Sequence, residues 1–180
     1  ALCNPPKATT SVASWYFQTG GLRRRLALLA RTADVLSALH GKGLVYSDPS
    51  PHNIFVSEAS DATEVRFIDS DNIHYVSSAG LPTVFTPGYG APELIRGASG
   101  VNSLTDAHAF AVLTFQTLSL VHPLIGDAVA NGPPEREEEA FAGAMPWVDD
   151  PGNSSNHCSI GMPRSVTLSA RSAEISQRAF

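Results

Sequence analysis

A long amphipathic helix is predicted by the spacing of apolar residues between Leu22 and His40. These residues recur at intervals of three or four positions, at Leu22, Leu26, Leu29, Ala33, Leu36 and Leu39. Such spacing places one apolar face on a helix. Gly41 and Gly43 are expected to end it in left-handed backbone. The arginines mostly lie off this face, so we expect solvated side chains and no basic binding patch from Arg23, Arg24, Arg25 and Arg31.

Further helices are predicted in the second half of the chain. The segment from Ala107 to Leu120 is apolar on nearly every side, which predicts a helix buried all round. Asp106 in its first turn suits the helix dipole or a cap. Another helix is expected near Pro133, with glutamates in its first turns, and a last one from Ser165 to Phe180. Because the sequence stops inside that helix, we expect a fragment of a longer protein.

A short β-hairpin is predicted before these helices. Ile54 to Val56 and Val65 to Ile68 are apolar strands, and Ser57 to Glu64 form a polar turn. In an antiparallel pair, the residue that enters the first strand lies beside the residue that leaves the second. Asn53 and Asp69 are therefore expected to be neighbours.

Length and composition favour one globular domain that does not bind nucleic acid directly. The chain has 180 residues, 43% hydrophobic and 16% charged, with a formal charge of −5. This size and composition can bury a core, and the negative charge gives no reason to expect direct nucleic-acid binding. Cys3 and Cys158 lack the spacing of a zinc site or disulfide framework, which favours a reducing cytoplasm. No run of eighteen apolar residues and no signal peptide occur, so no membrane partner is expected.

Three oxygen-bearing side chains around the hairpin indicate phosphate chemistry. Asp48 precedes Asn53 by five positions, and Asp69 follows the second strand. Oxygen ligands at the mouth of a hairpin suit Mg²⁺ that is also held by substrate phosphates. Asp48 is then free to orient a hydroxyl nucleophile. Phosphoryl transfer requires little of a protein beyond this orientation, positioning of the reactants and neutralisation of charge by Mg²⁺. The alternative is a solvated loop of turn-forming residues.

With these pieces in order, the chain resembles the C-terminal lobe of the eukaryotic-like protein kinases. The family's catalytic loop, His-Arg-Asp, four residues and Asn, stands here as Tyr46-Ser47-Asp48-Pro49-Ser50-Pro51-His52-Asn53. The metal-binding Asp-Phe-Gly stands as Asp69-Ser70-Asp71, which looks like a bacterial branch of kinase-like proteins, and Ala-Pro-Glu ends at Glu93 after Thr86 and Tyr89. The resemblance implies an α+β, mostly α fold: helices around a buried central helix, with the hairpin carrying the catalytic loop.

The resemblance also implies a role for each matching residue. Asp48 would be the catalytic base, while Asn53 and Asp69 would hold Mg²⁺ or Mn²⁺ with ATP. Thr86 would lie in the loop that presents the acceptor, and its identity favours Ser/Thr specificity. Glu93 would anchor the activation segment, and Asp106 would brace the catalytic loop. Phe55 would form the floor under adenine, although an aromatic core residue is an equally good interpretation.

Several positions depart from the family. Tyr46 and Ser47 replace His-Arg, so the arginine that reads a phosphorylated loop is missing and activation by loop phosphorylation is not expected. Ser50 replaces a lysine that touches the γ-phosphate, which predicts slower transfer. The N-terminal lobe, with its glycine-rich loop and strand lysine, is absent from this sequence. We therefore expect residues 1–21 to be a linker and the start of the C-lobe, 22–180 to be a C-lobe truncated at both ends, and the missing N-lobe of the same protein to be a partner.

Three functions follow from these observations. The first is an ATP-dependent protein serine/threonine kinase whose C-lobe, this chain, is inactive alone. The second is a pseudokinase scaffold, favoured by the altered triplets but opposed by the retention of Asp48, Asn53 and Asp69 together. The third is a small-molecule phosphotransferase of the aminoglycoside or choline kinase type. Those enzymes lack the run from Thr86 to Glu93, which favours a protein substrate.

Overall fold

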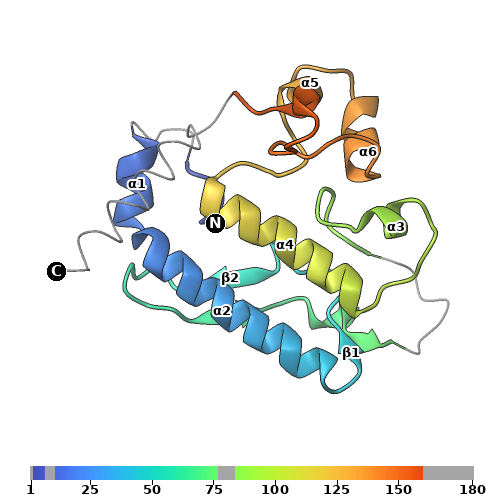
Figure 1. Cartoon of the computed structure of the whole chain (residues 1–180). Helices are drawn as coiled ribbons and strands as arrows, with labels where there is room; N and C mark the ends of the chain where they lie inside the picture. Colours follow the sequence, from blue (N-terminus) through green and yellow to red (C-terminus); the bar gives the residue numbers. More distant parts are fainter. Residues whose placement is uncertain (1, 7–10, 77–83, 160–180) are drawn as a thin grey trace.

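The computed structural model describes residues 2–6, 11–76 and 84–159 of the chain. Its centre is a pair of long helices, α2 (Gly21–His40) and α4 (Ser103–Ser119), which lie side by side (Figure 1). A short helix, α1 (Val12–Gln18), precedes α2 and packs against it. The mostly helical fold predicted from the sequence is thus confirmed, while the helix expected from Ser165 to Phe180 lies outside the described residues.

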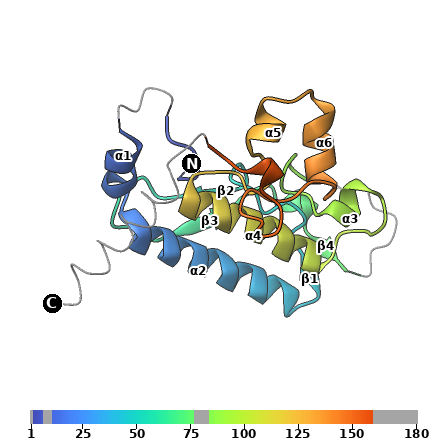
Figure 2. The same ribbon diagram turned by 45° about the horizontal axis from the view of Figure 1, so that its top comes forward.

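Two small antiparallel sheets lie along this helix pair (Figure 2). In one, β2 (Ile54–Val56) pairs with β3 (Val65–Phe67), in a register that sets Ile54 opposite Phe67. The predicted hairpin is therefore confirmed, with Ile68 just beyond the second strand. The other sheet pairs β1 (Leu44–Val45) with β4 (His74–Tyr75). Strand β4 was not predicted, because two residues are too short to show an alternating pattern.

The remaining elements are short and surround α4. They are the helices α3 (Pro92–Ile95), α5 (Asp127–Ala130) and α6 (Glu135–Phe141), and the 3₁₀ turns η1 (Ser70–Asn72) and η2 (Ser154–Asn156). Helices α5 and α6 gather together on the side of α4 away from α2 (Figure 1). No helix in the described part of the chain has both the length and the apolar character needed to cross a membrane.

Helix α4 supplies much of the core. Its Ala109, Val112 and Leu113 form a buried cluster with Ile54 and Tyr89. The prediction that α4 is buried on every side is wrong in one respect, because Ala107 and Ala111 are exposed. The exposed stripe also includes Leu104, at 74% exposure, while most of the remaining helix is at least partly buried. The capping residue is Asn102, whose side chain accepts hydrogen bonds from the first turn while Thr105 bonds back to its N–H.

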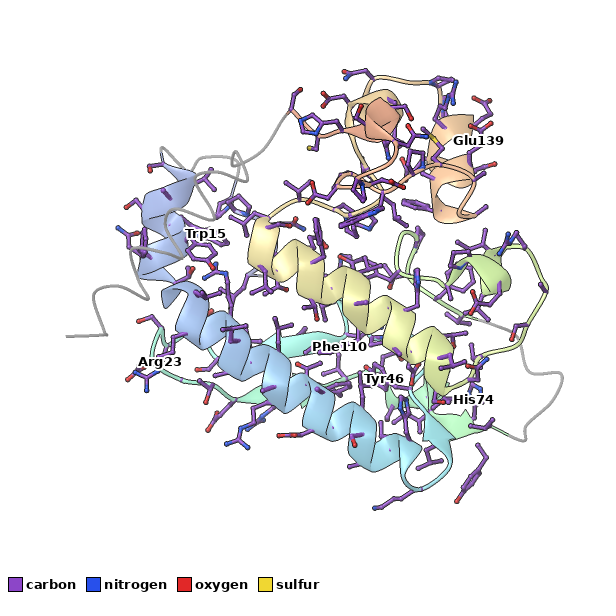
Figure 3. The ribbon with its side chains drawn as sticks, viewed as in Figure 1. Trp15, Arg23, Tyr46, His74, Phe110 and Glu139 are labelled. Carbon is purple, nitrogen blue, oxygen red and sulfur yellow. The ribbon has the colours of Figure 1, made fainter. Side chains whose placement is uncertain are left out.

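Two arginines of α2 overturn the prediction of a solvated face. Arg24 and Arg25 are 4% and 0% exposed. Arg24 donates to the backbone carbonyls of Thr19, Ser57 and Ala62 at 2.5 to 3.0 Å, two of which belong to the hairpin turn. Arg23, by contrast, is exposed and points away from the molecule (Figure 3).

The turn after α2 also differs from the prediction at one position. Gly43 has a φ of 72°, in the left-handed region that glycine favours, as expected. Gly41 is right-handed, with a φ of −61°, because the helical turn continues through it. The reversal into β1 is therefore made at Gly43.

Candidate active site

The carboxylate of Asp48 is the centre of a buried hydrogen-bond network. Asp48 is 6% exposed and lies in the loop between β1 and β2. Its Oδ2 accepts a hydrogen bond from Asn53 Nδ2 at 2.8 Å and another from Thr86 Oγ1 at 2.8 Å. Its Oδ1 accepts from the backbone N–H of Thr86 at 2.9 Å. Because every partner is a donor, the network fixes the orientation of a carboxylate acceptor.

Ser50 joins this network through Thr86. Ser50 is fully buried, and its Oγ lies 2.9 Å from Thr86 Oγ1. A hydroxyl has one proton to donate. When Thr86 gives that proton to Asp48, the proton between the two hydroxyls comes from Ser50. The structure thus brings together Asp48, Ser50, Asn53 and Thr86, four residues singled out from the sequence.

Asp106 holds the backbone of the loop that carries Asp48. It is 0% exposed, and its two oxygens accept the backbone N–H groups of Tyr46 and Ser47, each at 2.8 Å. His40 Nε2 lies 2.9 Å from Oδ2. Asp106 therefore does not cap its own helix, a task that Asn102 performs. Instead it links α2, α4 and the loop that carries Asp48.

Tyr46 ties the two hairpin strands together at their open end. Its single hydroxyl proton is shared between two acceptors, the carbonyls of Asn53, at 3.2 Å, and Ile68. Its ring packs edge-on against Phe67, with centroids 4.8 Å apart. Burial, reinforced by the charges of Asp48, Asp69 and Asp106, raises the pKa of Tyr46 to about 12. The phenol therefore stays protonated and keeps the proton that the two carbonyls share.

Asn53 and Asp69 are held on adjacent ends of the hairpin. The backbone N–H of Ile68 donates to the Asn53 carbonyl at 3.0 Å, which extends the strand pairing to the residue before Asp69. Asn53 uses its side-chain nitrogen on Asp48, so its amide oxygen is the group left to bind a metal. Asp69 is exposed and has a left-handed φ of 57°. Such a pair of oxygen donors fits Mg²⁺ that is also bound by phosphates.

The described part of the chain offers no larger cluster of metal ligands beside that pair. Among the residues that the structure describes, no group of three or more His, Cys, Asp or Glu side chains could hold a metal ion. A dedicated all-protein cage is thus not found in this part of the chain. A Mg²⁺ site here would depend on the substrate for its other ligands, as is usual for this cation.

Phe55 lies at the edge of an open hollow. Its side chain is 56% exposed, so the interpretation as a buried core aromatic is wrong. The hollow measures about 460 Å³ and is lined by residues from the N-terminal segment, α1 and β2, among them Leu2, Asn4, Trp15, Phe55 and Glu58. Its volume and mixed lining suit a small organic ligand.

Glu93 lies in the first turn of α3. Its carbonyl accepts backbone N–H groups of Ala98 at 2.8 Å and Ser99 at 3.2 Å, which closes the turn after the helix. Burial lowers the pKa of His108, and the charge of Glu93 partly offsets this effect. Glu93 therefore acts electrostatically on α4.

Three residues of the site were not identified from the sequence as contributors. His40 contacts Asp106 from the end of α2, Ser47 binds it through its backbone, and Asn72 lies beside Asp69. Their contacts join residues that are distant in sequence or that lie in a turn. No spacing pattern could have indicated His40 or Asn72, whereas Tyr46 and Ser47 stood in the motif as replaced positions whose contacts the motif does not give.

Comparison with known proteins adds evidence of relationship. No family model matches the chain. It is 34% identical over 116 residues to the serine/threonine-protein kinase pkn2 of Myxococcus xanthus, which covers 60% of this chain. It is 35% identical over 96 residues to the serine/threonine-protein kinase PknG of Mycobacterium leprae (53% of the chain), and 28% identical over 115 residues to the DNA damage-responsive serine/threonine-protein kinase RqkA of Deinococcus radiodurans (61%). The matched regions are 14%, 12% and 16% of those proteins' lengths, so the chain spans less than a fifth of each.

Proposed function

From this similarity to serine/threonine protein kinases, we propose that the full-length protein transfers phosphate from ATP to Ser or Thr of a protein substrate, and that this chain is its C-terminal lobe. The observation that carries the proposal is the buried Asp48 carboxylate, which is held by Asn53 on one side and Thr86 on the other. Orientation of a carboxylate toward an acceptor hydroxyl is what phosphoryl transfer requires of a catalytic base.

In this proposal, Asp48 accepts the proton of the acceptor hydroxyl. Asn53 and Asp69 hold Mg²⁺, or Mn²⁺ in its place, which neutralises charge on the ATP phosphates when bound. Tyr46 keeps the two hairpin ends in register by donating to the backbone beside each of these ligands. The hairpin thus sets the separation between the two metal ligands.

The adenine ring of ATP is assigned to the hollow beside Phe55. An exposed aromatic side chain offers a face on which a purine can stack. Phe17 of α1 is also exposed, at 47%, in the region where the N-lobe is expected to cover the site. We therefore place the N-lobe of the same protein over Phe55 and α1.

The lack of a lysine at Ser50 predicts slow transfer. A lysine at this position would bring a positive charge to the γ-phosphate, whereas Ser50 is fully buried and offers a neutral hydroxyl. Transition-state stabilisation by charge is a major contribution to phosphoryl transfer. Ser50 is assigned to the positioning of Thr86 in this proposal.

A pseudokinase scaffold and a small-molecule phosphotransferase are the competing functions. The scaffold is favoured by the replacement of His-Arg and Phe-Gly by Tyr46-Ser47 and Ser70-Asp71. The contact of Thr86 with Asp48 favours a protein acceptor over a small alcohol, because it lays the segment that leads to Glu93 directly on the base.

The test of this proposal is the class of acceptor. The full-length protein is incubated with Mg²⁺ and [γ-³²P]ATP, with casein as a generic protein acceptor and with choline or kanamycin as small alcohols. Label on Ser or Thr of protein is the expected result. Label on a small alcohol alone would establish the phosphotransferase, and the absence of any transfer would favour the scaffold.

A further inference from the structure

Asn72 contacts both loops of the proposed active site. It is the last residue of the turn η1, which begins directly after Asp69. Its side-chain Nδ2 donates to Asp69 Oδ2 at 3.1 Å. Its backbone carbonyl accepts the hydroxyl of Ser47 at 2.9 Å. One residue thus connects the proposed metal ligand to the residue immediately before Asp48.

The Ser47 end of this connection is firmly held. Ser47 is buried, at 6% exposure, and its backbone N–H is bound to Asp106. Its φ of 76° lies in the left-handed region, which is unfavourable for a residue with a side chain. A strained backbone of this kind persists only where several surrounding contacts hold the residue in that conformation. The bond from the Ser47 hydroxyl to Asn72 is one of these contacts.

The Asn72 end is also supported by backbone pairing. His74 Nδ1 lies 2.8 Å from the Asn72 carbonyl, and His74 pairs with Val45 in the β1–β4 sheet. His74 and Tyr46 lie at the same end of the α2–α4 pair (Figure 3). The Asn72 carbonyl is therefore fixed to β4, which pairs with the strand that leads into the loop carrying Asp48.

We propose that Asn72 is a positioning residue, which holds the Asp69 carboxylate in place relative to the catalytic loop through its bond to Ser47. This inference rests on the proposed function, since it takes Asp69 as a metal ligand. Partners that orient a ligating carboxylate strengthen metal binding. The two hydrogen bonds of Asn72, to Asp69 and to Ser47, form a tether between the loop of Asp69 and the loop of Asp48. Because this tether consists of the chain's own hydrogen bonds, the two loops are aligned without a phosphate group on the activation segment.

Two variants remove the tether at its opposite ends. Asn72→Ala removes the amide that binds Asp69. Ser47→Gly removes the hydroxyl but keeps the N–H on Asp106, and it relieves the left-handed strain, so its thermal stability is expected to stay close to wild type. Asn131→Ala is the matched control, because Asn131 is exposed on the far side of α4 and bonds only within α5 among the described contacts.

The readout is binding, measured by calorimetric titration of ADP into the full-length protein at a series of Mg²⁺ concentrations. For both tether variants, the Mg²⁺ concentration at which Mg²⁺ has produced half of its full effect on ADP affinity is expected to rise about tenfold. Binding of ADP without Mg²⁺ and the Asn131→Ala variant are expected to be unchanged. A merely structural role would weaken ADP binding with and without the metal alike.

The outcomes separate this inference from the proposed function. If Asp69→Asn weakens Mg²⁺-dependent binding while Ser47→Gly and Asn72→Ala do not, the positioning role is overturned and the proposed metal ligand stands. If the wild-type protein shows no Mg²⁺-dependent binding of ADP, both the proposed function and the inference that rests on it are contradicted.

Discussion

The Thr86 side chain and backbone both donate to Asp48, the hydroxyl to Oδ2 at 2.8 Å and the N–H to Oδ1 at 2.9 Å. Thr86 thus forms hydrogen bonds with both oxygens of a buried carboxylate that lies 38 residues away in sequence. The contact joins the loop of the proposed base to the segment proposed to present the acceptor.

Replacement of Thr86 by Val removes one of these bonds and keeps the shape of the side chain. A hydrogen bond to a charged group contributes about 2 kcal/mol, so Thr86→Val is expected to lower the free energy of unfolding by that amount. Thr86→Ser keeps the hydroxyl and should lose less than half as much. Urea-induced unfolding of the chain checks this order, and equal losses in the two variants would contradict it.

Arg25 is predicted to be a major contributor to stability although it is an arginine on a helix. Its guanidinium is 3.9 Å from the ring centre of Tyr16 and donates to the carbonyls of Tyr16 and Gly21, each at 3.1 Å. A lysine cannot reproduce this planar stacking with several donors. We expect Arg25→Lys to lower the free energy of unfolding by about 2 to 3 kcal/mol.

The matched control is Arg23→Lys, two positions earlier on the same helix. Arg23 is exposed, and surface substitutions of this kind change stability by no more than about 0.5 kcal/mol. The fluorescence of Trp15, whose ring lies 5.4 Å from Arg25, reports the unfolding of this region. Similar urea midpoints for the two variants would show that the buried contacts of Arg25 add nothing to stability.

The protein is expected to lose stability in mild acid because of the buried imidazole of His122. Its Nδ1 accepts the backbone N–H of Leu124 at 3.2 Å, and its Nε2 lies 3.1 Å from the Gly88 carbonyl, so the ring is neutral with its proton on Nε2. Burial lowers the pKa of His122 to about 4, against an opposing effect of the Gly88 bond. Protonation of Nδ1 would also remove the acceptor of the Leu124 N–H.

The direction of the pH effect follows from the lowered pKa. Between pH 6.5 and 4 the unfolded chain binds a proton at His122 that the folded chain does not, so stability is full above pH 6.5 and falls toward pH 4, by about 3 kcal/mol in total. His122→Asn keeps an acceptor for Leu124 and cannot titrate. Unfolding curves from pH 7 to 4 should therefore be flatter for His122→Asn than for wild type. Equal slopes, or an equal flattening in the exposed His52→Asn control, would contradict this assignment.

The hairpin and the two long helices could be predicted because their causes are local. Short apolar runs on both sides of a polar turn specify β2 and β3, and a spacing of three to four specifies α2. The positions of Asp48, Asn53 and Thr86 could be named in advance because they belong to recognisable short motifs. Their hydrogen bonds bring them together as the motifs suggest.

The burial of Arg24 and Arg25 could not be predicted, because its cause is not local. Periodicity assigns charged residues off the apolar face to solvent, but the hairpin turn brings carbonyls of Ser57 and Ala62 over Arg24. Buried charged groups are stable only with such partners. The tether from Ser47 to Asn72 was missed for the same reason, since it depends on a bond between residues 25 positions apart.

The most direct test of the central claim is phosphoryl transfer by the full-length protein when Asp48 or Asp69 is changed. Wild type, Asp48→Asn, Asp69→Asn and the surface control Asp34→Asn are compared with Mg²⁺, [γ-³²P]ATP and a protein acceptor. The account predicts label on Ser or Thr with wild type and Asp34→Asn, and a loss of at least about a hundredfold with the other two. Transfer at the wild-type rate by Asp48→Asn, or no transfer by wild type, would contradict it.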